Sequence, residues 1–319
     1  SHRSKDFVAV MDEARALALE LLGLEGKGYK ALFLGGGASL EFLMVPYNLM
    51  KENGKAAYLD SGTWATAAIK EAKFFGETVI VGSSKEDNYN YVPKGYEIPA
   101  DADYFHCTSN NTIFGTQMKE FPTTNVPVVC DMSSDIFSRV LDFSKFDIIY
   151  AGAQKNMGPA GAALVVIKEE ILGKNGRNIP SMLDYAKHIK ADSMYNTPPV
   201  FSVYASLLTL QWIKAKGGVA AVEKLNNAKA ALLYGEIDRN PLFKGTAALE
   251  DRSNMNVTFL LTNPEHTETF DKMWKEAGIS GLPGHRSVGG YRASIYNAMP
   301  IESVQVLVDV MQALEKSVQ

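Results

Sequence analysis

The sequence predicts an α/β protein in which a large domain with a mainly parallel β-sheet precedes a smaller α+β domain. In the first part of the chain, short apolar runs alternate with segments whose apolar residues recur at helical spacing, as in strand–helix–strand units. After Pro198-Pro199 the pattern changes to long helices. A chain of 319 residues is long enough for two domains. We place the boundary near residue 220, which gives domains over 1–220 and 221–319.

The first predicted element is a helix that begins near Phe7. Its apolar residues recur three or four positions apart as far as Leu21, and Gly23 and Gly26 end the segment. Short apolar runs bounded by Gly or polar residues follow, and such runs are typical of buried strands. We predict strands over 31–34, 56–59, 78–81, 104–107, 126–130, 148–151 and 162–167, with helices over 39–50 and 63–75 between the first three strands.

The second part of the chain predicts fewer strands and longer helices. Its apolar residues again recur at helical spacing, interrupted by two runs that alternate as strands do. We predict helices over 202–216, 219–238, 265–277 and 301–316, with strands over 255–261 and 291–296. These elements form the smaller α+β domain.

Composition excludes several classes of function. Apolar residues make up 46% of the chain, yet no uninterrupted apolar stretch approaches the roughly 20 residues that span a bilayer. The net charge of −4 offers no general attraction to phosphate backbones, and no basic run with interleaved aromatic residues is present. We therefore expect neither a membrane protein nor a nucleic-acid-binding protein, and we expect no metal.

The two cysteines, Cys107 and Cys130, lie at the ends of predicted strands, and neither has the other nearby in sequence. Buried free thiols in such positions favour a reducing compartment. The sequence also shows no signal peptide. We expect a cytoplasmic protein.

The centre of the chemistry is predicted at Lys155, which lies on a loop of small residues after the strand over 148–151. Burial favours the neutral amine that forms a Schiff base with an aldehyde. Asp131 ends another predicted strand, and parallel strands bring their ends to one edge of a sheet. Pyridoxal phosphate (PLP) enzymes need this pair, because the carboxylate keeps the pyridine nitrogen protonated. Taken alone, each residue has another explanation: Lys155 could be a solvated loop residue, and Asp131 could be the N-cap of a helix.

Three further features fit a planar phosphorylated cofactor. The segment 35–39, Gly-Gly-Gly-Ala-Ser, follows a strand and opens a helix, where backbone N–H groups bind phosphate. It lacks the pattern of an ATP or NAD loop, although a plain tight turn would also explain it. Trp64 begins a predicted helix and could stack on a ring, or it could fill the core. Thr112 lies on a polar loop and could bond a phenolic oxygen, unless it only forms a turn.

Basic residues cluster in two loops. His2 and Arg3 open the chain, and His285, Arg286 and Arg292 occur among glycines near the C-terminus. Arginine binds carboxylate and phosphate through two parallel hydrogen bonds, so this set suits a substrate with two anionic groups. Solvated surface charge is the alternative for each residue alone.

The motifs together resemble the phosphoserine aminotransferase family, in the class V branch of the fold-type I PLP enzymes. The resemblance extends from Ser1 to the C-terminus. It is carried by the segments at 1–3, 36–40, 60–64, 151–161, 194–199 and 284–300. It implies the fold-type I architecture, a transaminase, and PLP as the cofactor.

The resemblance also implies a role for each motif residue. Lys155 bonds covalently to the cofactor, Asp131 pairs with the pyridine nitrogen, Trp64 stacks on the ring and Thr112 bonds its hydroxyl oxygen. The cofactor phosphate is held by the 37–39 turn of Gly37, Ala38 and Ser39 and by Ser133 and Gln154, with Asn196 and Thr197 from the other subunit of a homodimer. Arg292 binds the substrate α-carboxylate, and His2, Arg3, His285 and Arg286 bind the distal anion.

The implied reaction transfers the amino group of glutamate to 3-phosphohydroxypyruvate, which gives O-phospho-L-serine for serine biosynthesis. A phosphorylated threonine analogue on the route to pyridoxine is a second implied substrate. Members of the family carry a further segment ahead of the motif at 1–3, and we expect that segment to be missing here. Cysteine desulfurases and glyoxylate aminotransferases are rival enzymes of the same class, and a non-catalytic ligand-binding fragment is a rival of another class.

Overall fold

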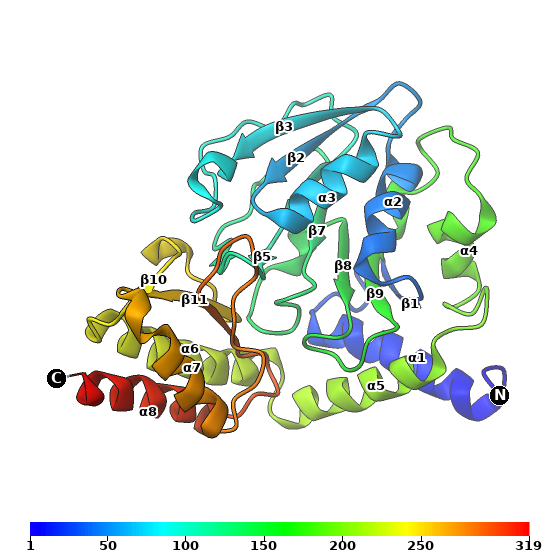
Figure 1. The fold of residues 1–319 in the computed structure, drawn as a ribbon. Coiled ribbons are helices and arrows are strands. Elements are labelled where there is room, and N and C mark those ends of the chain that lie inside the picture. Colours follow the sequence, from blue (N-terminus) through cyan, green and yellow to red (C-terminus); the bar gives the residue numbers. More distant parts are fainter. Residues whose placement is uncertain (319) are drawn as a thin grey trace.

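The computed structural model of the chain describes residues 1–318 and shows a large sheet domain beside a smaller domain (Figure 1). The large sheet has seven strands in the order β1-β9-β8-β7-β4-β2-β3. The strands are β1 Tyr29–Leu34, β2 Lys55–Asp60, β3 Glu77–Ser83, β4 Phe105–Thr108, β7 Val128–Asp131, β8 Ile148–Gly152 and β9 Ala163–Lys168. All neighbours from β8 to β3 are parallel, whereas β9 runs antiparallel to both β1 and β8.

Helices cover both faces of this sheet. α1 (Lys5–Leu21) and α5 (Val200–Ala215) pack on one face, where alternate strand residues such as Cys107 and Cys130 join their core. α2 (Gly37–Leu49), α3 (Thr63–Ala72) and α4 (Tyr185–Lys190) pack on the other. Because successive strand residues point to opposite faces, a sheet buried on both sides needs nearly continuous apolar strands. This requirement explains the apolar runs that predicted the strands.

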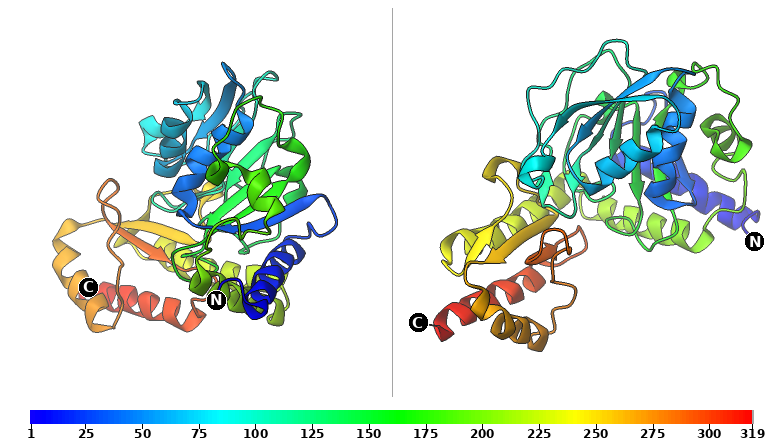
Figure 2. Two further views of the ribbon diagram at one scale, coloured as in Figure 1. Left: turned by 90° about the vertical axis from the view of Figure 1, so that its right-hand side faces the viewer. Right: turned by 45° about the horizontal axis from the view of Figure 1, so that its top comes forward.

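The smaller domain has a three-stranded antiparallel sheet in the order β10-β11-β12 (Figure 2). Its strands are β10 Phe243–Gly245, β11 Asn256–Leu261 and β12 Tyr291–Ser294, and its helices are α6 Val219–Arg239, α7 Thr267–Glu276 and α8 Ile301–Ser317. The start of α6 packs in the core of the large domain, and its middle, from Ala230, packs in the core of the small one. The boundary near residue 220 stays a prediction.

The fold confirms the predicted α/β class and adds elements that the sequence pattern did not indicate. These are the hairpin of β5 (Asn110–Asn111) and β6 (Thr116–Gln117), the helix α4 and the strand β10. Several predicted elements are shorter in the structure: the strands over 126–130 and 255–261 begin at Val128 and Asn256, and the helix over 265–277 spans Thr267–Glu276. The helix over 63–75 ends at Ala72, where turn bonds replace helical ones before Gly76.

The strand predicted over 291–296 is also shorter in the structure. It ends at Ser294: the Ile295 backbone N–H still donates to the Met255 carbonyl at 2.9 Å, but the Ile295 carbonyl accepts from the buried Lys229 amine instead of from β11. The backbone therefore leaves the sheet at this point.

Candidate active site

Two neighbouring parallel strands of the large sheet end at one pocket. Asp131 is the last residue of β7 and pairs in register with Tyr150 of β8. Lys155 follows the end of β8 after a short turn. Both line the same pocket, whose other walls are Gly37, Ala38, Ser39, Phe42, Trp64, Thr108, Asn110, Thr112, Ser133, Ser134 and Gln154. The structure thus brings together most residues that the sequence singled out.

Lys155 is half-buried, and its Nζ donates a hydrogen bond to Thr112 Oγ1 at 3.1 Å. Burial lowers the pKa of Lys155, and the positive charge of Arg292 lowers it further, while the carboxylate of Asp131 raises it. On balance the pKa of Lys155 is lowered, so a larger fraction of the amine is neutral at a given pH than in a free lysine. A neutral lysine amine is the form that attacks an aldehyde or accepts a proton from carbon.

Asp131 is buried, and its surroundings bind one side of the carboxylate. Its Oδ1 accepts hydrogen bonds from the Ser133 backbone N–H at 2.9 Å and from Ser133 Oγ at 2.6 Å. The Gly152 backbone N–H in turn donates to Ser133 Oγ at 3.2 Å. Burial raises the pKa of Asp131, which the Ser133 bonds and the charge of Lys155 oppose. A cationic ring N–H would relieve the cost of keeping this carboxylate ionised.

The N-terminus of α2 is open to an anion. Gly36 and Gly37 have φ angles of +95° and +64°, which favour glycine, and no side chain caps the helix. A Cβ placed on Gly37 would meet nothing within 4 Å, so there is space beside the unpaired N–H groups. Thr108 Oγ1 adds a buried hydroxyl without a partner among residues 1–318. These donors fit a phosphate group.

Trp64 and Gln154 complete the pocket as exposed side chains. Trp64 lies at the N-terminus of α3 with 39% of its surface exposed, although it is a large apolar residue. Gln154 precedes Lys155 and is also exposed. A wide aromatic surface beside the amine fits a planar ring. The pocket as a whole therefore fits PLP.

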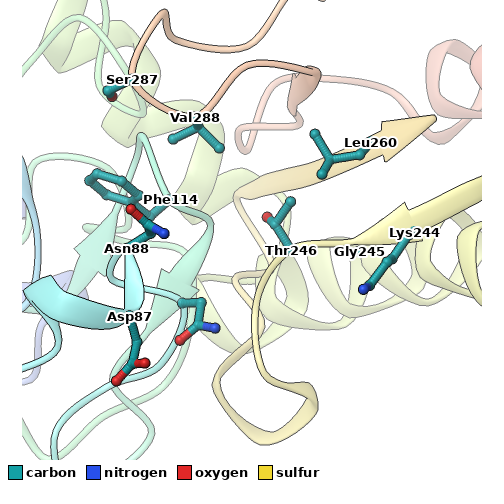
Figure 3. Close-up of a pocket in the computed structure, with 10 residues that line it drawn as sticks. Asp87, Asn88, Phe114, Lys244, Gly245, Thr246, Leu260, Ser287 and Val288 are labelled. Carbon is teal, nitrogen blue, oxygen red and sulfur yellow. The ribbon is translucent and has the colours of Figure 1, made fainter. Parts of the chain in front are cut away.

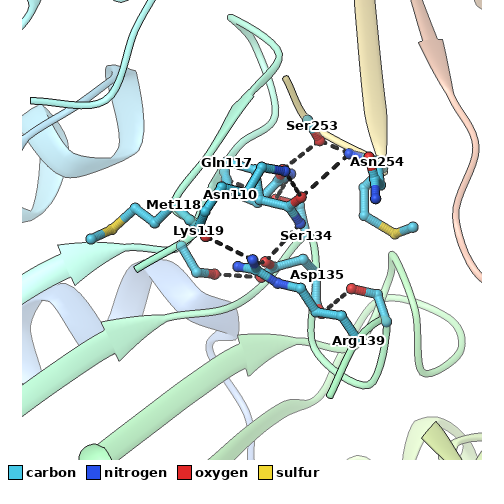
Figure 4. A network of polar contacts seen from close by, with 12 residues as sticks. Asn110, Gln117, Met118, Lys119, Ser134, Asp135, Arg139, Ser253 and Asn254 are labelled. Atoms are coloured by element: carbon cyan, nitrogen blue, oxygen red, sulfur yellow. Dashed lines mark hydrogen bonds and ion pairs between the residues drawn. The ribbon is translucent and has the colours of Figure 1, made fainter. Parts of the chain in front are cut away.

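A polar network fixes the hairpin that carries Thr112 (Figure 4). Asn110 Nδ2 donates to Ser134 Oγ and to Asn256 Oδ1, both at 2.8 Å. Beside it, Asp135 pairs with Arg139 at 2.9 Å. The hairpin is thereby bound to the 131–135 turn and to β11 of the small domain. Sequence reasoning did not find Asn110 or Ser134, although they lie two and three residues after the ends of β4 and β7, which is the one signal they carry.

Arg292 extends from β12 of the small domain and is half-buried. Its Nε is buried without a hydrogen-bond partner among the described residues. Arg292 does not line the pocket of Lys155 and instead lines a separate cavity beside β12 and α8, but its positive charge lowers the pKa of Lys155. An unpaired, half-buried guanidinium is suited to a carboxylate ligand.

The loop over 284–290 carries His285 and Arg286 and packs on the hairpin rather than into the pocket. Val288 contacts a small apolar cluster that includes Phe114. Figure 3 shows the side chains of Val288 and Phe114 at one wall of a separate cavity. This cavity has a volume of ≈ 400 Å³. Neither His285 nor Arg286 lines the pocket of Lys155.

Four other predicted residues also lie outside the pocket. Arg3 Nε donates to His2 Nε2 at 3.2 Å, and Arg3 is exposed at the N-terminus. Asn196 and Thr197 are exposed just before α5. None of the four lines the pocket that Lys155 and Asp131 share.

Fold and pocket define a PLP-dependent enzyme of fold type I, and comparisons with known proteins identify its family. The family model "Aminotransferase class-V" matches residues 1–307. The chain is 88% identical over 318 residues to a phosphoserine aminotransferase of Flavobacterium johnsoniae, covering 100% of this chain and 89% of that protein. The chain therefore belongs to the class V aminotransferases, in the phosphoserine aminotransferase family, and is a PLP-dependent transaminase.

Solved structures agree with this assignment. A phosphoserine aminotransferase from Bacillus circulans subsp. alkalophilus superimposes with a TM-score of 0.96 at 44% identity, covering 100% of this chain and 89% of that one. A PLP-bound phosphoserine aminotransferase from Trichomonas vaginalis gives a TM-score of 0.91 at 35% identity, with 98% and 90% covered.

One further observation concerns the rival cysteine desulfurase, and another concerns the length and polarity of the helices. Cys107 and Cys130 are free and buried on β4 and β7, where no substrate could reach a thiol nucleophile, unlike the mobile cysteine that a desulfurase needs. Within residues 1–318, none of the helices is both long and apolar enough to cross a membrane.

Proposed function

We propose that this enzyme is a phosphoserine:2-oxoglutarate aminotransferase, which transfers the amino group of glutamate to 3-phosphohydroxypyruvate and forms O-phospho-L-serine. The observation that carries the proposal is the Lys155 amine, held by Thr112 in one pocket with Asp131. The names of the relatives, at up to 88% identity among those compared, support the choice of phosphoserine. The open donors at Gly37 support the phosphorylated cofactor.

The pocket residues that the sequence singled out each have a proposed role. When bound, PLP supplies the aldehyde that takes up the amino group and the ring that withdraws electrons from the reacting carbon. Lys155 holds the cofactor and moves a proton at its Nζ, which is favoured in the neutral form by burial. Asp131 holds the proton on the ring nitrogen. Thr112 binds the ring hydroxyl oxygen, and Trp64 covers one face.

The cofactor phosphate has its own proposed ligands. The backbone N–H groups at Gly37 and Ala38, with Ser39, lie at the positive end of α2. Ser133 and Gln154 line the same pocket. Gly37, Ala38, Ser39 and Gln154 supply donors that no carboxylate occupies, whereas the Ser133 hydroxyl would have to turn from Asp131 to donate to the phosphate.

Substrate anions are assigned to the basic residues. Arg292 binds the α-carboxylate, because its buried Nε lacks a partner among the described residues. His2, Arg3, His285 and Arg286 bind the distal phosphate or carboxylate, which requires them to approach a pocket that they do not line in the single chain.

We propose a homodimer, because several predicted site residues do not line the pocket within a single chain. Asn196 and Thr197 are exposed ahead of α5, beside the exposed apolar side chains of Phe201, Tyr204 and Leu208. A second subunit packed on this apolar face would receive both polar residues at its own cofactor phosphate. We further propose a cytoplasmic enzyme that also accepts a phosphorylated threonine analogue for pyridoxine biosynthesis, and domains over 1–220 and 221–319.

The test uses the purified chain loaded with PLP. Glutamate should convert the cofactor to its amine form, and 3-phosphohydroxypyruvate should then restore the aldehyde form, both followed by absorbance. O-phospho-L-serine should be found as the product by mass spectrometry. The proposed substrate would be contradicted if glutamate produced the amine form of the cofactor and glyoxylate, but not 3-phosphohydroxypyruvate, restored the aldehyde form.

A further inference from the structure

Three buried asparagines form a joint between the loop of Lys155 and the small domain. Asn156 directly follows Lys155, Asn226 lies on α6, and Asn297 follows β12, with exposed fractions of 4%, 1% and 5%. We call these three residues the asparagine joint. Buried amides are normally hydrogen-bonded, and in these three residues only Asn226 Oδ1 lacks a partner among residues 1–318.

The members of the joint bond to one another. The Asn297 backbone N–H donates to Asn156 Oδ1 at 3.0 Å, and Asn226 Nδ2 donates to Asn297 Oδ1 at 2.8 Å. The chain of amides therefore runs from the lysine loop through the end of β12 to α6. No water is needed for this connection.

The joint also holds the turn that follows Asp131. Asn156 donates to the Ile136 carbonyl, Asn297 to the Phe137 carbonyl and Asn226 to the Ser138 carbonyl, each at 3.0 Å. Three consecutive carbonyls are thus each bound by one asparagine.

Phe137 makes these bonds necessary. Its φ is +56°, a left-handed conformation that a bulky side chain rarely adopts, and its ring is fully buried. A turn in this conformation persists only where the surroundings hold it, and the bond from Asn297 to its carbonyl does so. Lys229 adds a second support, because its buried amine binds the Ile295 and Tyr296 carbonyls at 2.9 and 2.7 Å.

The three segments that meet at the joint carry the three groups that the reaction requires. One contains Asp131 and Ser133, another contains Lys155, and the third contains Arg292 four residues before Tyr296. Separate segments can be aligned only if something fixes their relative positions, and displacements of about 1 Å in an active site can cost on the order of 10²-fold in rate.

We propose that Asn297, with Asn156 and Asn226, positions the Lys155 amine relative to Asp131 and Arg292, so that the three asparagines are positioning residues of the reaction. This inference rests on the proposed function, whose chemistry assigns roles to those three groups. It adds residues that do not line the cofactor pocket.

The test compares Asn297→Ala with Asn227→Ala. Asn227 neighbours Asn226 on α6 but is exposed and accepts a bond only from Asn254 among the described residues, so it is a matched control. The first readout needs no cofactor: the full chain without PLP is acetylated at several pH values, and mass spectrometry of the Lys155 peptide gives the pKa of that amine. The second is kcat and KM for phosphoserine with PLP bound.

Asn297→Ala keeps the backbone bond to Asn156 but removes the bonds to the Phe137 carbonyl and from Asn226. We expect the Lys155 pKa to move up towards that of a free lysine, because the 136–138 turn that anchors the lysine loop through Asn156 is held less firmly and the amine becomes better hydrated. We expect kcat to fall on the order of 10²-fold, more than KM rises. A variant that matches Asn227→Ala in both readouts, or that loses thermal stability alone, would overturn the proposal.

Asn226→Ala provides a second test should Asn297→Ala not fold. It removes the two hydrogen bonds that Asn226 donates, and it substitutes no residue of the Lys155 loop or of β12. We expect a smaller shift in the same direction, and no shift would also overturn the proposal. A wild-type chain that does not transaminate phosphoserine would refute the proposed function instead, while the Lys155 pKa comparison would still decide the role of the joint.

Discussion

Replacing Asp131 by Asn tests whether its negative charge, rather than its shape, serves the reaction. Asn keeps an oxygen that can accept the two bonds from Ser133, at 2.9 and 2.6 Å, so the turn should keep its structure. The buried anion is lost. Because burial raises the pKa of Asp131, removing its charge relieves a desolvation cost, and we expect thermal stability to be unchanged or higher.

The loss of activity follows from the pairing that Asp131 would make with a cationic ring nitrogen. Breaking a buried pair by removing one partner costs about 3–5 kcal/mol, which corresponds to roughly 10²- to 10⁴-fold in kcat/KM. A second effect has a definite sign. Since the Asp131 carboxylate raises the pKa of Lys155, Asp131→Asn should lower that pKa below its wild-type value.

The assay measures kcat/KM for phosphoserine and the Lys155 pKa by acetylation at several pH values. Asp147→Asn is the control. Asp147 accepts a hydrogen bond from the Val128 backbone N–H at the other end of β7 and β8, away from the pocket. Activity within about threefold of wild type, or a Lys155 pKa that rises, would refute the reasoning for Asp131.

Three other predictions concern single side chains. Lys155→Ala should keep the fold but lose covalent attachment of PLP, and a variant that still transaminates at the normal rate would exclude Lys155. Arg292→Ala should impair both half-reactions by about 2–5 kcal/mol, whereas Arg286→Ala should impair phosphoserine more than glutamate, because phosphate carries the larger charge; equal losses for both substrates in Arg286→Ala would contradict the split. Mixing inactive Lys155→Ala chains with chains that carry both Asn196→Ala and Thr197→Ala should restore some activity, and exchange of subunits without recovery would exclude a shared site.

The sequence predicted the long elements because their patterns are strong. A sheet buried on both faces requires apolar strands, and the helices repeat their apolar residues over several turns. The missed elements are too short for a period to appear: β5 and β6 have two residues each, and β10 has three. The antiparallel direction of β9 likewise depends on its partners and not on its own residues.

The candidate site was predictable where chemistry and strand ends coincide. Lys155 and Asp131 follow apolar runs on neighbouring strands, so their meeting could be predicted. Asn110 could not be found in this way, because its partner Asn256 is 146 positions away in the chain. The asparagine joint could not be predicted for the same reason, because Asn156 and Asn297 are far apart in the sequence and meet only in the folded protein.

The most direct test of the account is to trap the cofactor on the protein. The chain is loaded with PLP and reduced with borohydride, and its peptides are analysed by mass spectrometry, with and without prior addition of O-phospho-L-serine. We predict a phosphopyridoxyl label on the Lys155 peptide alone, and its loss when phosphoserine, but not alanine, is added first. A label on another lysine, or a Lys155 label that phosphoserine does not remove, would contradict the central claim that Lys155 performs phosphoserine transamination.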